Sequence, residues 1–284
     1  MASRPKTLWA ALSPVIIGTA LAFADGALHL PSALAAAFGA IMIQIGTNLS
    51  NDYFDYLKGA DQADRLGPKR VTQAGLIKPK AVKRGFMLVY GLAFAAGLYL
   101  TWRGGWPILV LCILSIASGI LYTAGPFPLG YHGLGDLFVL IFFGLVAVGG
   151  TYYVQALRIT RQVMIAGIAP GLMSTAILTV NNLRDIDTDR KAGKRTLAVR
   201  FGKRFARMEY LMSILGACLV PALLVLCCPG HAYALAATAV FLLAIPSITR
   251  VFREEPGPVF NVILAHTGRL LFIYSILFSI GWVL

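Results

Sequence analysis

Long apolar runs recur along the whole chain, and they constrain its fold more than any other feature. Most of them contain about eighteen residues or more, enough for one helix to cross the ~30 Å hydrocarbon core of a bilayer. Only 13% of the residues are charged and 58% are hydrophobic, whereas a soluble domain carries roughly 25% charged residues. We therefore predict an all-α, polytopic membrane protein that forms a single transmembrane domain over residues 1–284.

The apolar runs, bounded by charged residues, glycine and proline, predict about nine transmembrane helices. Their expected ranges are 8–24, 33–50, 84–101, 106–124, 136–156, 163–181, 208–227, 232–250 and 261–282. When the connections alternate between the two faces, 21 of the 25 Lys and Arg residues fall on one face. Because cytoplasmic connections retain Lys and Arg, we expect a multi-pass protein of the cytoplasmic membrane with its N-terminus inside and its C-terminus outside.

Acidic residues are rare, and most of them lie in two short stretches. The chain has twelve Asp and Glu residues, and seven belong to these stretches. The first acidic stretch contains Asp52, Asp55, Asp61 and Asp64, and the second contains Asp185, Asp187 and Asp189. Both follow directly on apolar runs, at the expected cytoplasmic ends of the second and sixth helices. A solvated loop would explain one such stretch, but two in matching places favour a shared function.

The spacing of the acids points to a divalent cation. Asp52 and Asp55 are three residues apart, and Asp185 and Asp189 are four apart, so each pair shares one face of a continuing helix. Like charges placed in this way repel, and Mg²⁺ is a hard ion held by one or two carboxylates plus substrate phosphate oxygens. Both stretches also run into basic residues. The pattern favours a carboxylate–Mg²⁺–diphosphate site with a cationic clamp.

At these residues the chain resembles the UbiA superfamily of intramembrane aromatic prenyltransferases. The string from Asn51 to Asp55, continuing to Asp61, is similar to the first Asp-rich motif of that superfamily, and 185–189 is similar to the second. The superfamily usually has its third acid at the position of Gly59. The likeness extends over the whole chain, nine helices included.

Several longer strings look most like the branch of the superfamily that prenylates 1,4-dihydroxy-2-naphthoate in menaquinone biosynthesis. In this chain the third acid stands at Asp61 instead of at position 59, and that spacing is itself similar to this branch. The strings are Arg4 to Thr7, Gly59 to Pro68, Tyr122 to Pro126, Gly133 to Asp136, and Asn181 to Leu197. The resemblance implies transfer of a polyprenyl group from an isoprenoid diphosphate to dihydroxynaphthoate, with decarboxylation, giving demethylmenaquinone.

The resemblance also assigns roles to individual residues. The implied Mg²⁺ ligands are Asp52, Asp55, Asp61, Asp185 and Asp189. The implied diphosphate-binding residues are Asn48, Asn51, Arg65, Lys69, Arg70, Lys191 and Lys194. Asp136, or an acid of the first stretch, is a candidate to take up any proton released. The expected partners are the polyprenyl diphosphate, dihydroxynaphthoate and the lipid bilayer, with no nucleic acid.

Two alternatives stay open from the sequence. The acceptor could be 4-hydroxybenzoate, homogentisate or a non-aromatic molecule instead. A different class is a membrane transporter or lipid-binding protein, which would move its substrate without covalent change. Ion-coupled transport favours ionisable groups at mid-membrane depth, and the apolar runs carry almost none.

Overall fold

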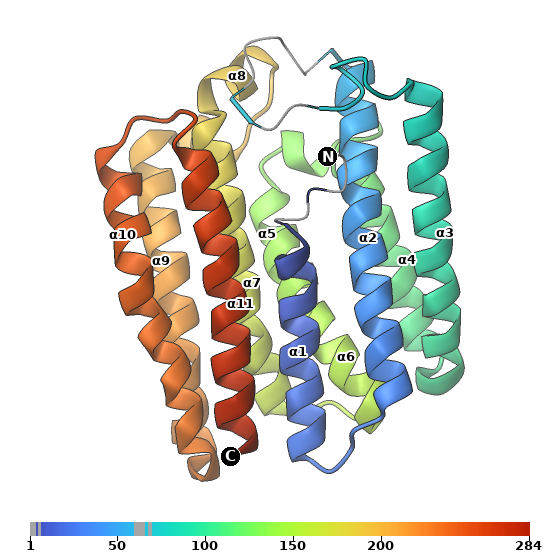
Figure 1. The fold of residues 1–284 in the computed structure, drawn as a ribbon, viewed down its shortest axis with the longest axis vertical. Helices are drawn as coiled ribbons and strands as arrows, with labels where there is room; N and C mark the ends of the chain where they lie inside the picture. Colours follow the sequence, from blue (N-terminus) through green and yellow to red (C-terminus); the bar gives the residue numbers. More distant parts are fainter. Residues whose placement is uncertain (1–3, 5–6, 60–65, 68–69) are drawn as a thin grey trace.

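The computed structural model describes residues 4, 7–59, 66–67 and 70–284, which fold into helices joined by short turns (Figure 1). No strand occurs in this described part. The helices of the first half are α1 (Leu8–Ala24), α2 (Leu30–Leu57), α3 (Pro79–Gly104), α4 (Trp106–Leu121), η2 (Leu129–Tyr131), α5 (Gly135–Leu140), η3 (Ile141–Val146) and α6 (Ala147–Ala156). Those of the second half are α7 (Arg161–Arg184), α8 (Ile186–Lys191), α9 (Leu197–Cys227), η4 (Pro229–Ala239), α10 (Val240–Arg253) and α11 (Phe260–Val283).

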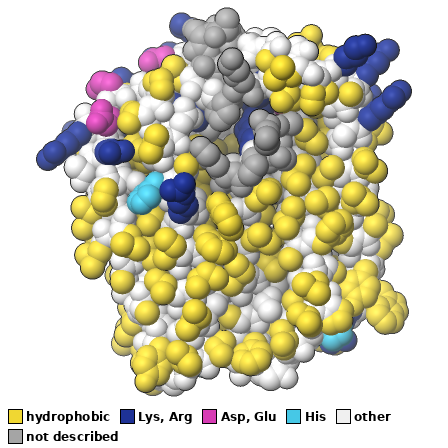
Figure 2. All heavy atoms as spheres, in the orientation of Figure 1, with side chains coloured by type: hydrophobic (Ala, Val, Ile, Leu, Met, Phe, Trp, Pro, Cys, Tyr) yellow, Lys and Arg dark blue, Asp and Glu magenta, His cyan; other side chains and the backbone are white. Residues whose placement is uncertain are grey.

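The transmembrane prediction is confirmed in its main features. Among the described residues, seven helical segments are long and apolar enough to cross a membrane, and α1 and α4 are shorter apolar helices. Together they fall where the sequence predicts spans. Hydrophobic side chains cover the flanks of the bundle, and charged side chains gather at the end that carries α8 (Figure 2). The chain is therefore a multi-pass, all-α membrane protein.

The predicted span 136–156 is one continuous helical segment with a change of pitch in its middle. Its central part, η3, is a π-helix between α5 and α6. Gly144 in η3 packs against α7 so closely that an added Cβ would lie 2.5 Å from the carbonyl oxygen of Gly167. Small residues allow helix backbones in membranes to approach in this way, and a π-bulge accommodates a local change of register.

The buried core lies mainly in the second half of the chain. In the most apolar 18-residue stretch of α7, 67% of the stretch is buried, whereas the corresponding stretches of α2 and α3 are each 22% buried. Buried side chains of α7, α9, α10 and α11 form one large cluster that also includes residues of α1 and α6. In the first half, a smaller cluster joins Leu100, Ile108 and Val154. The helices of the first half therefore enclose space instead of filling it.

The C-terminal end of α11 lies at the end of the bundle opposite α8 (Figure 1). Asp52 and Asp55 belong to the last turns of α2, and the second stretch lies where α7 passes into α8. These parts of α2 and α8 lie at the same end of the bundle. The described acids of both stretches are therefore at one end of the bundle, as the sequence predicts.

Candidate active site

A cavity of about 410 Å³ lies in the middle of the bundle. It is enclosed mainly by α1, α2, α4, the α5–α6 segment and α7, and most of its wall is apolar. On α2, the lining residues extend from Ala36 to Asp55, which is about 28 Å at 1.5 Å per residue. One end is polar and is lined by Asn48, Asn51, Asp55, Arg70, Asp185, Asp189 and Lys194. The cavity is thus a long apolar space with a charged end.

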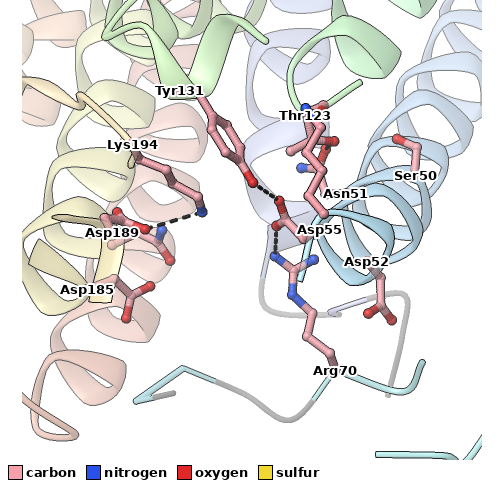
Figure 3. A network of polar contacts seen from close by, with 12 residues as sticks. Ser50, Asn51, Asp52, Asp55, Arg70, Thr123, Tyr131, Asp185, Asp189 and Lys194 are labelled. Carbon is pink, nitrogen blue, oxygen red and sulfur yellow. Dashed lines mark hydrogen bonds and ion pairs between the residues drawn. The ribbon is translucent and has the colours of Figure 1, made fainter. Parts of the chain in front are cut away.

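The first acidic stretch is held by residues far away in the sequence (Figure 3). Asp55 is only 2% exposed. It accepts hydrogen bonds from Arg70 Nη2 at 2.5 Å and from Tyr131 Oη at 2.9 Å. Asp52 is also 2% exposed, and its Oδ2 accepts a hydrogen bond from the backbone N–H of Val71 at 3.2 Å. The loop after α2 and the short helix η2 therefore fix the carboxylates of α2.

The second acidic stretch is held mainly by its own sequence neighbours. Arg184 donates to both carboxylate oxygens of Asp185, at 2.8 and 2.5 Å. The same guanidinium donates to Asn181 Oδ1 and to Asn261 Oδ1, each at 2.8 Å. Lys194 Nζ lies 3.2 Å from Asp189 Oδ1. In the second stretch, each carboxylate that faces the cavity is therefore neutralised by a cation a few positions away in the sequence.

The two stretches share one electrostatic environment. Burial raises the pKa of the Asp189 carboxyl, and the charges of Asp185 and Asp55 raise it further, while Lys194 opposes the shift. The negative charges of α2 therefore act on α8 across the end of the cavity. A group of carboxylates brought together in this way favours a bound cation.

Tyr131 stands between cationic and anionic groups at this end of the cavity (Figure 3). Lys58 Nζ lies 4.8 Å and Lys194 Nζ 5.0 Å from the centroid of its ring, both within cation–π range. Lys58 also donates to the carbonyl oxygen of Thr123 at 2.6 Å, and Thr123 Oγ1 donates to Asn51 Oδ1 at 3.0 Å. Burial lowers the pKa of Lys58, the charge of Asp55 opposes this shift, and the charge of Lys194 adds to it. The connection between α4 and α5 thus completes the site.

The structure brings together most of the predicted site residues that it describes. Asn48 donates to Thr7 Oγ1 at 3.1 Å and lines the cavity together with Asn51, Arg70 and Lys194. Lys191 is exposed at the surface. The predicted residues Asp61, Arg65 and Lys69 lie outside the described residues, as does Asp64.

Asp136 lies in α5 and is 6% exposed. Its backbone carbonyl accepts a hydrogen bond from Thr175 Oγ1 at 3.4 Å, and its charge raises the pKa of the buried Tyr122, after the larger effect of burial itself. Tyr122 lines the cavity. Asp136 therefore lies behind the cavity wall, and its role as a proton acceptor stays a prediction.

Sequence reasoning did not select several residues of the polar end, among them Lys58, Tyr131 and Asn181. Asn181 lies four residues before Asp185, on the same helical face, so the spacing rule that paired the acids would also have found it. No local pattern marks Tyr131, because its hydrogen bond to Asp55 joins η2 to a helix far away in the sequence.

The donor set fits a hard divalent cation. Carboxylate and amide oxygens from two different helices face the same polar space, and such oxygens are the ligands of Mg²⁺. Within the described residues, no three Asp, Glu, His or Cys side chains lie close enough to hold an ion by themselves. Mg²⁺ in phosphate sites is commonly bound by one or two carboxylates, with phosphate oxygens and waters completing the shell. The arrangement therefore suits an ion shared with a diphosphate.

Comparison with known proteins agrees with this geometry. The model of the UbiA prenyltransferase family matches residues 11–280. The chain belongs to the UbiA prenyltransferase family. A curated family member from Escherichia coli K12, named 1,4-dihydroxy-2-naphthoate octaprenyltransferase, is 38% identical over 288 aligned residues, covering 98% of this chain and 92% of the relative. One of the same name from Haemophilus influenzae is 37% identical and covers 98% and 93%.

Solved UbiA structures share the fold. A UbiA homolog from Aeropyrum pernix K1 superposes with a TM-score of 0.72 at 19% identity, covering 98% of this chain and 97% of the other. A homolog from Archaeoglobus fulgidus, solved with DMAPP and Mg²⁺, gives a TM-score of 0.68 at 14% identity, covering 99% and 97%. At these identities the likeness shows that this chain has the UbiA fold.

Proposed function

We propose that the chain is a Mg²⁺-dependent prenyltransferase that transfers a polyprenyl group from an isoprenoid diphosphate to 1,4-dihydroxy-2-naphthoate. The ring carboxylate leaves as CO₂, and the product is demethylmenaquinol, the hydroquinone form of demethylmenaquinone. One observation carries the proposal: two acidic stretches and their cations meet at the polar end of a long apolar cavity. The names of the relatives support the choice of acceptor.

The shape and polarity of the cavity suit a polyprenyl diphosphate. A polyprenyl tail is as apolar as lipid, so its burial between helices costs little, while its diphosphate stays at the charged end. Lys194 and Arg70 supply positive charge there, and Asn48 and Asn51 supply amide groups. We place this end on the cytoplasmic side, because the connections rich in Lys and Arg lie with it.

Asp52, Asp55, Asp185 and Asp189, with Asp61 as a further ligand, would hold Mg²⁺, which when bound would supply positive charge to the leaving diphosphate. The allylic C–O bond breaks and its electron pair stays on the diphosphate. A ring carbon of the acceptor then donates an electron pair to the allylic cation. Breakage of the bond to the carboxylate returns an electron pair to the ring. The apolar walls exclude water from the cation, and the ring of Tyr122 can face it.

A matched pair of substitutions in the second acidic stretch tests the proposal. Asp189→Asn removes a buried carboxylate of the cavity, whereas Asp187→Asn changes a carboxylate whose side chain is 70% exposed and pairs with Arg190 at 3.5 Å. Purified protein is assayed with polyprenyl diphosphate and dihydroxynaphthoate over a Mg²⁺ titration. Loss of an outer partner of a metal typically lowers activity about 10–100-fold. We expect Asp189→Asn to lose more activity than that, and Asp187→Asn to keep an activity near that of the wild type.

Near wild-type turnover of Asp189→Asn would refute the assignment of the metal site. A panel that adds 4-hydroxybenzoate and homogentisate tests the acceptor separately. Prenylation of one of these, with none of dihydroxynaphthoate, would leave the prenyl transfer standing and show that the acceptor is wrong.

A further inference from the structure

The last helix, α11, carries a cation within its membrane-spanning part. Arg269 lies nine residues after Phe260, the first residue of α11, which is about 14 Å along the helix axis at 1.5 Å per residue. Its neighbours Gly268 and Leu270 are buried, but Arg269 itself is exposed. An ionisable side chain at such a depth is rare in membrane proteins and commonly marks a functional site.

Arg269 faces the lipid and not the substrate cavity. The wall of that cavity includes Leu264 of α11, and five residues along a helix correspond to a rotation of about 140° away from it. The Cβ atoms of a helix tilt toward its N-terminus, and the N-terminal end of α11 lies at the end of the bundle that carries α8 (Figure 1). The guanidinium of Arg269 therefore extends toward the charged end of the bundle, as arginines in membrane helices do when they reach for the lipid headgroups.

Two further basic groups lie near Arg269. His266 precedes it by three residues, so the two side chains share one face of α11. Arg250, in the last turn of α10, is exposed, and the charges of Arg250 and Arg269 both act on the ring of His266. In Figure 2, a histidine and a neighbouring cationic side chain stand among hydrophobic side chains on the flank of the bundle, over α10 and α11. Arg250, His266 and Arg269 thus form one group, the flank cluster.

Hydrogen bonds between helices hold the flank cluster in place. His266 Nδ1 lies 2.7 Å from Oγ of Ser247 on α10, and Ser247 is only 4% exposed. One residue further along α11, Thr267 Oγ1 lies 3.0 Å from Tyr210 Oη on α9. When Ser247 donates its hydroxyl proton to Nδ1, the His266 ring presents Nε2–H as a donor to a ligand. The orientation of the imidazole is therefore set by buried groups.

No carboxylate neutralises the flank cluster in the part of the chain that the structure describes. The ion pairs found there include neither Arg250 nor Arg269. Glu255 follows α10 closely in the sequence, but its carboxylate pairs with Lys203 of α9 at 2.7 Å. Two guanidinium groups beside an imidazole, with no acid among them, favour an anionic ligand.

We propose that the flank cluster binds the phosphate of an anionic phospholipid. Basic sites between membrane helices bind anionic headgroups, and the N–H groups of a guanidinium match phosphate oxygens in pairs. The acyl chains of such a lipid would lie against exposed apolar side chains on the same helix faces. Val262 and Ile273 lie four residues before His266 and four after Arg269, and both are exposed. A free phosphate would have to leave water to reach Arg269, so a lipid is the favoured source of the anion.

Arg269→Gln tests the proposal, with Arg84→Gln on α3 as the matched control. Arg84 is also exposed, so each variant loses one surface arginine. Native mass spectrometry of the purified full chain gives the Kd values of phosphatidylglycerol and of phosphatidylcholine with the same acyl chains. We expect Arg269→Gln to weaken phosphatidylglycerol binding about tenfold, as loss of a hydrogen bond to a charged group does, and to leave phosphatidylcholine binding unchanged. Arg84→Gln should bind both lipids as the wild type does.

Arg250→Gln is the second test, because Arg250 lies in the last turn of α10, where a substitution disturbs the helix least. It should also weaken phosphatidylglycerol binding, so the proposal stays open to refutation even when Arg269→Gln does not fold. Unchanged phosphatidylglycerol binding in either variant, or an equal loss in Arg84→Gln, would overturn the proposal. Displacement of the bound lipid by inorganic phosphate would show that the cluster takes a free anion and would overturn it as well.

Discussion

The two acidic stretches face the same end of one cavity, but the chain holds them in different ways. In the second stretch, the cation that neutralises Asp185 is its immediate neighbour, and the one that neutralises Asp189 is five residues away. In the first stretch, the two partners of Asp55 among the described residues lie 15 and 76 positions away. The second stretch is thus a locally built unit at the end of α7, whereas the first depends on a loop and on η2.

The surroundings strengthen this contrast. The second stretch continues from α7, the most buried of the described spans, and the first continues from α2, one of the two least buried. A carboxylate fixed by a packed helix cannot move without disturbing the core. A carboxylate fixed by a loop can change partners at lower cost. We therefore expect substitutions at the second stretch to cost more folding stability than substitutions at the first.

The largest expected effect comes from Arg184→Gln. The side chain of Arg184 is 1% exposed and that of Asp185 is 9% exposed. Removing one partner of a buried ion pair leaves an uncompensated charge and typically costs about 3–5 kcal/mol. We expect a correspondingly lower melting temperature in detergent, measured by thermal unfolding of the purified protein.

Arg190→Gln is the matched control, because its ion pair with Asp187 is exposed on both sides. Exposed pairs contribute about 0–1 kcal/mol, so this variant should melt close to the wild type. Similar melting temperatures for the two variants would mean that the second stretch is not the rigid one.

An intermediate effect is expected from Arg70→Gln. Arg70 and Asp55 are also buried, at 6% and 2% exposure, but this pair joins α2, one of the two least buried of the described spans, to a residue outside the helices. We expect a stability loss of about 1–3 kcal/mol, smaller than that of Arg184→Gln, together with a higher KM for the polyprenyl diphosphate. Thermal unfolding and steady-state kinetics measure the two quantities. A loss of stability as large as that of Arg184→Gln would contradict the contrast between the stretches.

The same contrast explains what the sequence could predict. Apolar runs and spacing rules located the spans, both acidic stretches and the cations that follow them, because these are local patterns. The bond between Tyr131 and Asp55 joins residues 76 positions apart, and no short pattern encodes it. The pocket lined by Lys58, Tyr131 and Arg200 was missed for the same reason, since these residues come together only after the bundle has formed. The π-helix η3 was also missed, because hydrophobic runs do not report helical pitch.

The smallest expected effect comes from Tyr131→Phe, which removes the hydrogen bond to Asp55 and keeps the ring. A hydrogen bond to a charged group contributes about 1.5–3 kcal/mol. Because Asp55 keeps its ion pair with Arg70, we expect a stability loss at the lower end of this range and a modest rise in the KM for the diphosphate. Tyr131→Leu also removes the ring between Lys58 and Lys194. We expect this variant to raise the KM for the diphosphate further than Tyr131→Phe does. If Tyr131→Phe is as damaging as Tyr131→Leu, the hydroxyl and not the ring carries the function of this residue, and the first stretch depends on a single bond from η2.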